Sequence, residues 1–183
     1  SILLVRDPRD AVISFYFSQK FSHAITKGKE GMHLSKIRER LNASDDPNYD
    51  FDYIKDRVRE LNKSIKSYIK YLPHDKTRIY RYEDIIFNKA LWIKDMCNYL
   101  NITLSEEEVD TLVKKHDVVP SAEQVDKHIR KVVPGNHKDY FNKEVIDYMN
   151  QKFDYALKAF GYNNVPSYDM NSLDFSGIDL ESF

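Results

Sequence analysis

The sequence has little cysteine and little glycine, and it lacks a long apolar run. Its single cysteine, Cys97, excludes an internal disulfide and a zinc site built from several cysteines, and we expect no metal site. No apolar run approaches the ~20 residues that a membrane-spanning helix needs, so we expect no membrane span. The formal net charge of −1 gives no overall attraction for a polyanion, so a nucleic-acid partner is not expected either.

The composition is otherwise typical of a globular protein. Hydrophobic residues make up 42% and charged residues 31% of the 183 positions, which is enough for one domain with a core, or for one domain and an arm. We assign residues 1–162 to this domain. No Lys or Arg follows Lys158, and residues 163–183 carry acidic side chains. We interpret this tail as a flexible acidic arm that could dock on a partner.

The first residues predict a strand that leads directly into a helix. Ile2–Val5 form a purely apolar run, which indicates a strand buried on both faces inside a parallel sheet. Because such strands seldom begin a domain, we expect the chain to be the C-terminal part of something longer. Asp7 is a good N-cap, Pro8 suits the first helical turn and Asp10 adds negative charge there, so a helix is expected to about Ser22.

Apolar spacing predicts the remaining elements, which are five helices and a second strand. Further helices are expected at 34–41, 51–72, 89–100, 105–115 and 145–160, and the second strand at 77–82. Ser105 with Glu108 forms a capping box, and Gly161 suits a helix C-cap. Residues 117–141 show no clear period. This order predicts an α/β layer fold with a parallel sheet.

The strongest candidate site lies where the first strand ends. Ligands of open α/β sheets bind outside the carboxyl ends of strands, and the amide groups of a following helix suit phosphate. Arg6 can grip two phosphate oxygens at once, and Ser14 lies two turns into the helix. The pattern equally allows Arg6 to pair with Asp10 and Ser14 to be a packing residue, so both interpretations stay open.

A second candidate is the basic segment from Arg130 to Phe141. It combines Arg130, Lys131 and Lys138 with a Pro134–Gly135 turn and aromatic side chains. A basic loop ordered by such a turn suits an anionic ligand. A solvated basic loop without a ligand explains the same pattern, and taken alone the segment favours that simpler interpretation.

Together these segments resemble the sulfotransferases that use 3′-phosphoadenosine 5′-phosphosulfate (PAPS). In that family a strand ends in Arg-(Asn/Asp)-Pro-(Lys/Arg)-Asp, and a Ser follows eight residues after the Arg, as in Arg6–Asp10 with Ser14. A later strand ends in Tyr-Glu-Asp, here Tyr82–Asp84. The family's Arg-Lys-Gly-x-x-Gly-Asp-Trp-Lys-Asn-x-Phe loop aligns with Arg130–Phe141 without a gap.

The resemblance implies both a fold and a set of cofactor-binding residues. The fold is a three-layer α/β arrangement with a parallel sheet and P-loop-kinase-like architecture, of which this chain would be the C-terminal two-thirds. The residues assigned to the cofactor are Arg6, Ser14, Tyr82, Arg130, Lys131 and Val132. Tyr82 would lie near the adenosine, and the other five would hold the 3′-phosphate, Val132 through its backbone N–H.

The chain departs from the family pattern in its loop and in its catalytic residues. Val132 stands where the family often has Gly, and His137 stands where it has Trp. The phosphosulfate loop and the catalytic base of the family are expected upstream of residue 1, so the catalytic residues are unknown. We interpret the six histidines of this chain as surface or packing residues.

The resemblance implies transfer of a sulfuryl group from PAPS to a hydroxyl or amine of a small-molecule or carbohydrate acceptor, leaving adenosine 3′,5′-bisphosphate (PAP). One alternative is a non-catalytic short form that binds a nucleotide or a protein, and for it an exposed strand edge would favour a homodimer. Another alternative is a P-loop kinase relative that uses ATP. The sequence motifs for glycosylation are too few to indicate secretion, so a cytoplasmic protein is expected.

Overall fold

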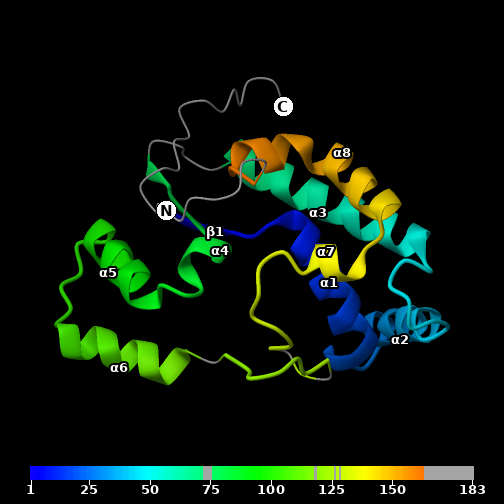
Figure 1. Ribbon diagram of the computed structural model, residues 1–183, viewed down its shortest axis with the longest axis horizontal. Coiled ribbons are helices and arrows are strands. Elements are labelled where there is room, and N and C mark those ends of the chain that lie inside the picture. The colour runs from blue at the N-terminus through cyan, green and yellow to red at the C-terminus, as the bar shows by residue number, and fades with distance from the viewer. Residues whose placement is uncertain (72–75, 118, 126, 128, 163–183) are drawn as a thin grey trace.

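The structure is a computed structural model that describes residues 1–71, 76–117, 119–125, 127 and 129–162 (Figure 1). Its elements, in chain order, are β1 (Ile2–Val5), α1 (Pro8–Phe17), the π-helical turn η1 (Ser18–Ser22), α2 (Lys29–Leu41), α3 (Phe51–Tyr71), β2 (Arg78–Arg81), α4 (Tyr82–Ile85), α5 (Lys89–Tyr99), α6 (Glu106–His116), α7 (His137–Tyr140) and α8 (Lys143–Ala159). The predicted acidic arm, residues 163–183, lies outside the described residues.

The two strands form a parallel sheet, which confirms the predicted α/β class. β1 pairs with β2 in register, so that Leu3 lies opposite Ile79 and Val5 opposite Arg81. Helices α1 to α3 lie between the two strands in the chain, as a parallel connection requires. Both strands therefore end at the same edge of the sheet, where α1 and α4 begin.

One expectation for β1 is wrong. The strand is not buried on both faces, because Leu4 exposes 50% of its surface and the neighbouring strand residues are only partly buried. In the described part of the chain β2 is the one strand that pairs with β1, so a single edge is covered. The apolar run correctly predicted a strand, but its burial depends on neighbours that a local pattern does not show.

Three helices build the core next to the sheet. α3 and α8 run side by side, and both contact α1 (Figure 1). Their buried side chains include Val12, Ile13, Ile54, Val58, Met149 and Phe153. The predicted helix at 51–72 matches α3, and α8 ends as expected, with Gly161 at a φ of 71° that suits glycine. This core fixes the position of α1, which carries the candidate site.

The helix after β1 ends near Ser22 as predicted, but its last turn is not a regular α-helix. Regular α-helix ends at Phe17, and the next turn widens so that the His23 N–H donates to the Ser18 carbonyl (2.6 Å). In this turn Lys20 is buried, and its ammonium donates to the carbonyl of Ser44 (2.6 Å). A buried ammonium needs such acceptors, and here they come from the segment after α2, where Asp45 also accepts (3.2 Å).

The other elements agree with expectation or begin earlier. α2 begins at Lys29 instead of Leu34, because Gly28 takes a φ of 93° and starts the helix there. The capping box of α6 is confirmed, since the Ser105 and Glu108 side chains each accept from the other's backbone N–H. α5 and α6 pack together at the end of the molecule opposite α2 (Figure 1).

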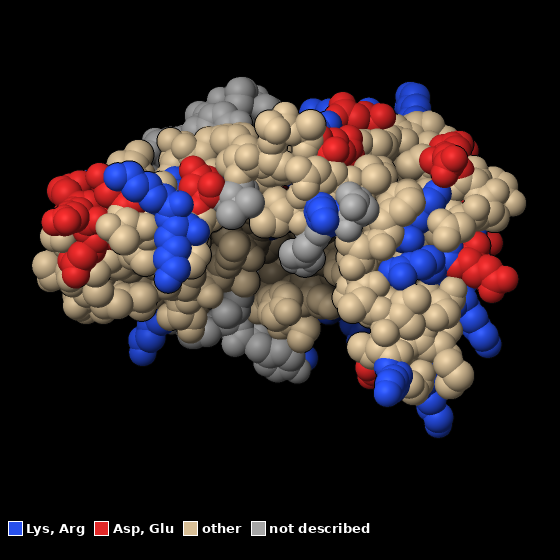
Figure 2. All heavy atoms as spheres, turned by 90° about the horizontal axis from the view of Figure 1, so that it is seen from below, with Lys and Arg blue, Asp and Glu red and all other residues tan. Residues whose placement is uncertain are grey.

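The surface is uneven in shape and charge. Figure 2 shows acidic side chains gathered over the end formed by α6, whose first turn holds Glu106, Glu107 and Glu108, and a hollow between this end and the end formed by α2. Among the described ranges, no helix combines the length and the apolar character needed to cross a membrane.

Candidate functional site

The turn between β1 and α1 is held by two hydrogen bonds. The Asp7 side chain caps α1 by accepting from the Arg9 N–H (2.9 Å), as predicted. The Asp7 N–H donates in turn to Glu83 Oε1 (2.9 Å), at the start of α4. The carboxyl ends of both parallel strands are thereby joined, and Arg6 is held between them.

Arg6 does not pair with Asp10, so that interpretation of the sequence is wrong. Its guanidinium lies 4.8 Å from the centre of the Tyr82 ring. Its Nε is buried and has no hydrogen-bond partner in the described part of the chain. A buried N–H without a partner is costly, and its place at the end of a parallel strand suits an anion that supplies the missing acceptor.

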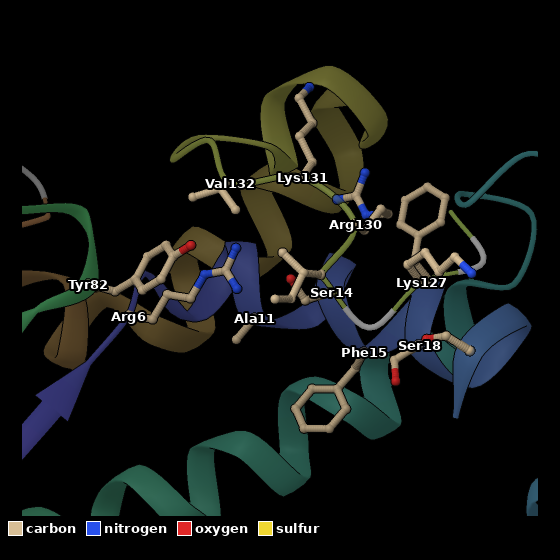
Figure 3. Close-up of a pocket in the computed structure, with 13 residues that line it drawn as sticks. Arg6, Ala11, Ser14, Phe15, Ser18, Tyr82, Lys127, Arg130, Lys131 and Val132 are labelled. Atoms are coloured by element: carbon tan, nitrogen blue, oxygen red, sulfur yellow. The ribbon is translucent and has the colours of Figure 1, made fainter. Parts of the chain in front are cut away.

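All six residues predicted to bind the cofactor line one cavity of about 380 Å³ (Figure 3). They are Arg6, Ser14, Tyr82, Arg130, Lys131 and Val132. Figure 3 shows the Arg6 guanidinium between Tyr82 and Ser14. The residues come from the turn after β1, from α1, from α4 and from the segment before α7, so the fold brings together side chains that are up to 126 positions apart (Arg6 to Val132).

Arg130 is the most buried charge of the cavity. It exposes 7% of its surface, and its guanidinium lies 4.1 Å from the centre of the Phe17 ring and 5.2 Å from that of Tyr140. Burial lowers the pKa of the Arg130 guanidinium, and the positive charge of Arg6 acts in the same direction. Two like charges that repel each other across one cavity favour an anion between them.

A carboxylate satisfies Arg130 in the structure. Arg130 forms an ion pair with Glu123, and the Tyr140 hydroxyl donates to the same carboxylate (2.6 Å). This contact could not be predicted from the sequence, because Glu123 lies in a segment without periodicity. An anion bound at Arg130 must therefore displace Glu123 or share the guanidinium with it.

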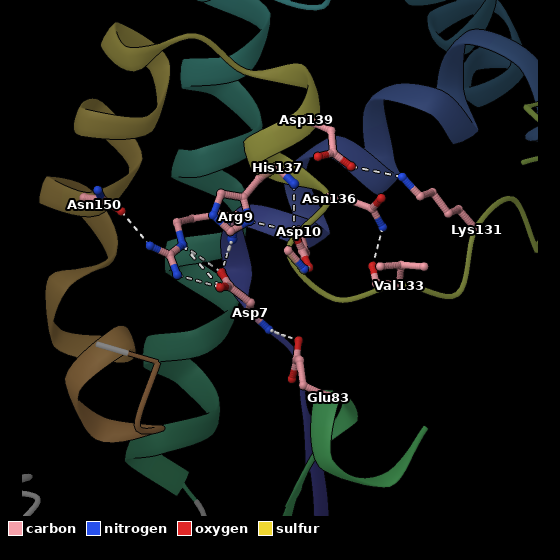
Figure 4. Close-up of polar contacts among 11 residues, drawn as sticks. Asp7, Arg9, Asp10, Glu83, Lys131, Val133, Asn136, His137, Asp139 and Asn150 are labelled. Atoms are coloured by element: carbon pink, nitrogen blue, oxygen red, sulfur yellow. Dashed lines mark hydrogen bonds and ion pairs between the residues drawn. The ribbon is translucent and has the colours of Figure 1, made fainter. Parts of the chain in front are cut away.

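Lys131 and Val132 also line the cavity, but their side chains are placed differently from that of Arg130. The Lys131 ammonium forms an ion pair with Asp139 (3.0 Å), and its side chain points away from Arg6 and Ser14 (Figures 3 and 4). A role for its charge requires that this pair open. Val132 is buried, with 7% of its surface exposed. Its place at the lining is compatible with an interaction through the backbone.

Asp10 ties the basic segment to α1, which the sequence did not indicate. One oxygen of the Asp10 carboxylate accepts from the Gly135 N–H (2.6 Å). The other accepts from the backbone N–H of His137 (2.9 Å) and lies 2.6 Å from its Nδ1 (Figure 4). Asp10 is fully buried. The sequence analysis considered this residue as a favourable charge in the first helical turn and as a partner of Arg6, but not as a link to residues 135–137.

Glu83 ties the Tyr82 segment to the rest of the site in a similar way. Besides the Asp7 N–H, its carboxylate accepts a hydrogen bond from the Tyr162 hydroxyl (2.7 Å). Burial raises the pKa of Glu83, although both hydrogen bonds oppose that shift. Burial likewise raises the pKa of Tyr82, and the Arg6 charge opposes it. The Tyr-Glu-Asp motif thus contributes an aromatic wall and a buried support.

The sequence also missed residues that extend the cavity along α1. Ser18 and Ser22 line it together with Ser14, and Lys127 lines it from the opposite segment. Their spacing of four residues is the signal that could have identified the serines as one helical face. In the part of the chain that the structure describes, the lining contains no His, Asp or Glu, and no group of such residues could hold a metal ion.

The geometry describes a binding site for an anion next to a flat ring. Two arginines, a serine and an aromatic ring converge on one cavity beside a helix N-terminus. The described lining offers donors and a stacking surface but no histidine or carboxylate. Binding and orientation of a phosphorylated ligand are the chemistry that these residues can perform.

Comparisons with known proteins agree in part with this geometry. A family model described as a sulfotransferase domain matches residues 1–161. A comparison with curated proteins found no match. Two solved structures resemble the chain, those of retinol dehydratase with androsterone and inactive cofactor PAP and of retinol dehydratase with retinol and PAP. In each case the identity is 19% and the TM-score 0.48, and the match covers 86% of this chain and 47% of the other. The chain therefore spans about half the length of those proteins.

Proposed function

The chain belongs to the sulfotransferase domain family, and we propose from this premise that its cavity binds the adenosine 3′-phosphate end of PAPS and of its product PAP. Arg6, Ser14 and Arg130 would hold the 3′-phosphate, and Tyr82 would lie along the adenosine. The observation that carries the proposal is the buried Arg6 Nε, which has no hydrogen-bond partner among the described residues, at a cavity that Arg130 lines as well.

The residues present fit such a ligand chemically. Arginine presents its N–H groups in a planar fork that matches two oxygens of a phosphate, and the hydroxyl of Ser14 can donate a further hydrogen bond. Lys131 and Val132 stand beside this phosphate position at the rim, where the backbone N–H of Val132 could contribute.

When bound, PAPS supplies an activated sulfuryl group for transfer to a hydroxyl or amine acceptor. The described residues of this chain would bind and orient the donor through its 3′-phosphate. They would also exclude water from one side of that phosphate, since Phe17 and Val132 are buried at the lining. Sulfuryl transfer by the whole protein, to a small-molecule or carbohydrate acceptor, is part of the same proposal.

Arg130 must exchange partners when the phosphate binds. In the structure its guanidinium is paired with Glu123. A phosphate carries more negative charge than a carboxylate and can accept two parallel hydrogen bonds, so it would compete well for the same N–H groups. The stacking of Arg130 against Phe17 and Tyr140 keeps the guanidinium at the cavity during this exchange.

A non-catalytic role is the second candidate. It is favoured by one observation, the lack of a histidine or a carboxylate in the described lining of the cavity. In that case this chain would bind the nucleotide without transferring a sulfuryl group. Both candidates require the 3′-phosphate, whereas an ATP-using relative of the kinases would not.

Calorimetric titration of the full chain with PAP and with ADP tests the proposal. We expect tighter binding of PAP, and a loss of about 10- to 100-fold in PAP affinity for Arg6→Ala, because hydrogen bonds to charged groups contribute about 1.5–3 kcal/mol. Arg59→Ala is the matched control, since Arg59 is an exposed arginine of α3 that pairs with Asp56. Equal affinity of the wild-type chain for PAP and ADP would overturn the proposal.

A further inference from the structure

We infer that Asp10 is a positioning residue for the 3′-phosphate site. Its carboxylate would hold the segment that carries Arg130 at the distance from Arg6 that a phosphate needs. The inference rests on the proposed function, because it explains how Arg6 and Arg130, the two arginines of the cavity, are kept at a fixed distance from each other. Asp10 itself is not among the residues that line the cavity.

The first argument is the set of hydrogen bonds that Asp10 accepts. They come from the Gly135 N–H at 2.6 Å, from the His137 N–H at 2.9 Å and from His137 Nδ1 at 2.6 Å. Within the described ranges, every hydrogen bond recorded for this carboxylate comes from the segment 135–137. Asp10 lies four positions after Arg6 in the chain, so a single short stretch carries one arginine and the anchor for the other.

The charge of Asp10 makes this anchor strong. Burial by itself would raise the pKa of Asp10, but the hydrogen bonds from His137 and Gly135 outweigh it and hold the pKa below its ordinary value of 3.8. An ionised carboxylate can only accept, so His137 Nδ1 carries the proton in this contact. If the segment moved away, a fully buried charge would lose these three donors, which is strongly unfavourable.

The contact reaches Arg130 through helix α7. His137 is the first residue of α7 and Tyr140 is its last. Tyr140 in turn contacts Arg130, with its hydroxyl 3.1 Å from Nη1 and its ring beneath the guanidinium. Asp10 therefore fixes the start of a short helix whose end helps to hold the second arginine.

The backbone conformation of the segment before α7 supports the same conclusion. Gly135 takes a φ of 85°, which favours glycine, at the turn between Val132 and α7. Such a turn does not define its own position relative to α1, because Pro134 and Gly135 lie outside the helices and strands. The Asp10 carboxylate supplies the missing constraint from the rigid first turn of α1.

A purely structural role predicts a different outcome from a positioning role. If Asp10 only stabilised the fold, its replacement would weaken the binding of every nucleotide to a similar extent. If it positions Arg130, its replacement would reduce the advantage of a ligand with a 3′-phosphate over one without. The ratio of the dissociation constants of adenosine 5′-monophosphate (AMP) and PAP measures this advantage directly.

The experiment compares Asp10→Asn with Asp147→Asn in the full chain, by calorimetry with PAP and AMP at a temperature where both variants are folded. Asp147 is an exposed aspartate of α8 that pairs with Lys143, so its replacement is a matched control. We expect Asp10→Asn to lower the AMP-to-PAP ratio by at least about tenfold, because a small misplacement of binding groups can cost up to about 100-fold. Affinity for AMP should change by less than about twofold.

A second variant keeps the test decisive if Asp10→Asn does not fold. His137→Phe removes the Nδ1 donor but keeps the backbone N–H and a buried ring, and we expect it to lower the ratio by about threefold or more. An unchanged ratio in whichever of these two variants folds would overturn the inference while leaving the proposed function intact. A wild-type chain that does not prefer PAP over AMP would instead overturn the proposed function.

Discussion

The backbone N–H of Asp7 donates a hydrogen bond of 2.9 Å to the carboxylate of Glu83, which lies 76 positions further along the chain. Each partner directly follows a cavity residue, since Asp7 follows Arg6 and Glu83 follows Tyr82. The hydrogen bond therefore holds the guanidinium of Arg6 beside the Tyr82 ring, at 4.8 Å from its centre. Motifs from two separate strands meet here because both strands end at the same edge of a parallel sheet.

The contact between Arg6 and Tyr82 gives the first prediction. Tyr82→Leu removes the ring that faces the guanidinium, and it also removes the surface expected to lie along the adenosine. A cation–π contact contributes about 0.5–2 kcal/mol, so we expect both PAP and AMP to bind about 3- to 30-fold more weakly. Calorimetry measures both affinities.

The control for this prediction is Tyr82→Phe, which keeps the ring and removes only the hydroxyl. It should bind both nucleotides within about twofold of wild type, because the attraction comes from the face of the ring. Equal losses in the Leu and Phe variants would show that the hydroxyl, and not the ring, matters at this position.

The ion pair between Glu123 and Arg130 gives the second prediction. Glu123→Gln removes a negative charge that competes with a phosphate for Arg130, and the amide can still accept from the Tyr140 hydroxyl. A partly exposed ion pair contributes up to about 1 kcal/mol, so we expect PAP to bind about 2- to 5-fold more tightly. Titration at low and at physiological salt should show the larger gain at low salt.

Glu106→Gln is the matched control for Glu123→Gln, because Glu106 is an exposed acid of α6 that pairs with Lys94. It removes the same charge from the chain and should leave PAP affinity unchanged. Weaker binding in Glu123→Gln would mean that the carboxylate orients Arg130 for the ligand and does not compete with it.

Local signals in the sequence predicted those parts of the site that depend on neighbouring residues. Asp7 and Pro8 located the start of α1, and the capping box located the start of α6. The starts of both helices could be predicted because caps are set within a few positions of the chain. The grouping of Arg6, Tyr82 and Arg130 came instead from the family resemblance, and these residues line one cavity.

Contacts between distant segments could not be predicted in the same way. Asp10 accepts its hydrogen bonds from residues about 125 positions away, and neither its place in the first turn nor its place in the Arg6–Asp10 motif indicates these partners. The exposure of Leu4 has the same origin, since it depends on which strands are present beside β1. The widened turn at Ser18–Ser22 follows from acceptors around Lys20 that only the folded chain brings together.

The depressed pKa of Asp10 gives the third prediction. Asp10→Asn should lower the free energy of unfolding by about 2 kcal/mol at pH 7, because hydrogen bonds to a charged group are lost. The unfolded state takes up its proton near the ordinary pKa of 3.8 and the folded state only at lower pH. The carboxylate therefore stabilises the fold above that value, and its contribution is lost as the pH falls through the folded pKa.

Urea unfolding of wild type and Asp10→Asn at pH 7 and at pH 3 measures this effect. We expect the gap in stability between the two proteins to narrow at pH 3. The exposed variant Asp147→Asn should show little difference from wild type at pH 7. A difference in the free energy of unfolding that has the same size at both pH values would mean that the ionisation of Asp10 does not contribute to stability.

Glu83 gives a prediction of opposite sign. Burial raises its pKa above the ordinary value of 4.5, so the folded state holds this proton more strongly than the unfolded state. Between the two pKa values the folded state binds more protons, and the free energy of unfolding falls as the pH rises. Glu83→Gln is neutral at every pH and keeps an oxygen that can accept from the Asp7 N–H. We therefore expect the variant to gain stability relative to wild type between pH 4 and pH 7 in urea unfolding.

Glu106→Gln, at an exposed position, serves as the control for Glu83→Gln. A variant that instead loses stability relative to wild type over this range would show that the ionised carboxylate, through its bonds to Asp7 and Tyr162, stabilises the site more than burial disfavours it.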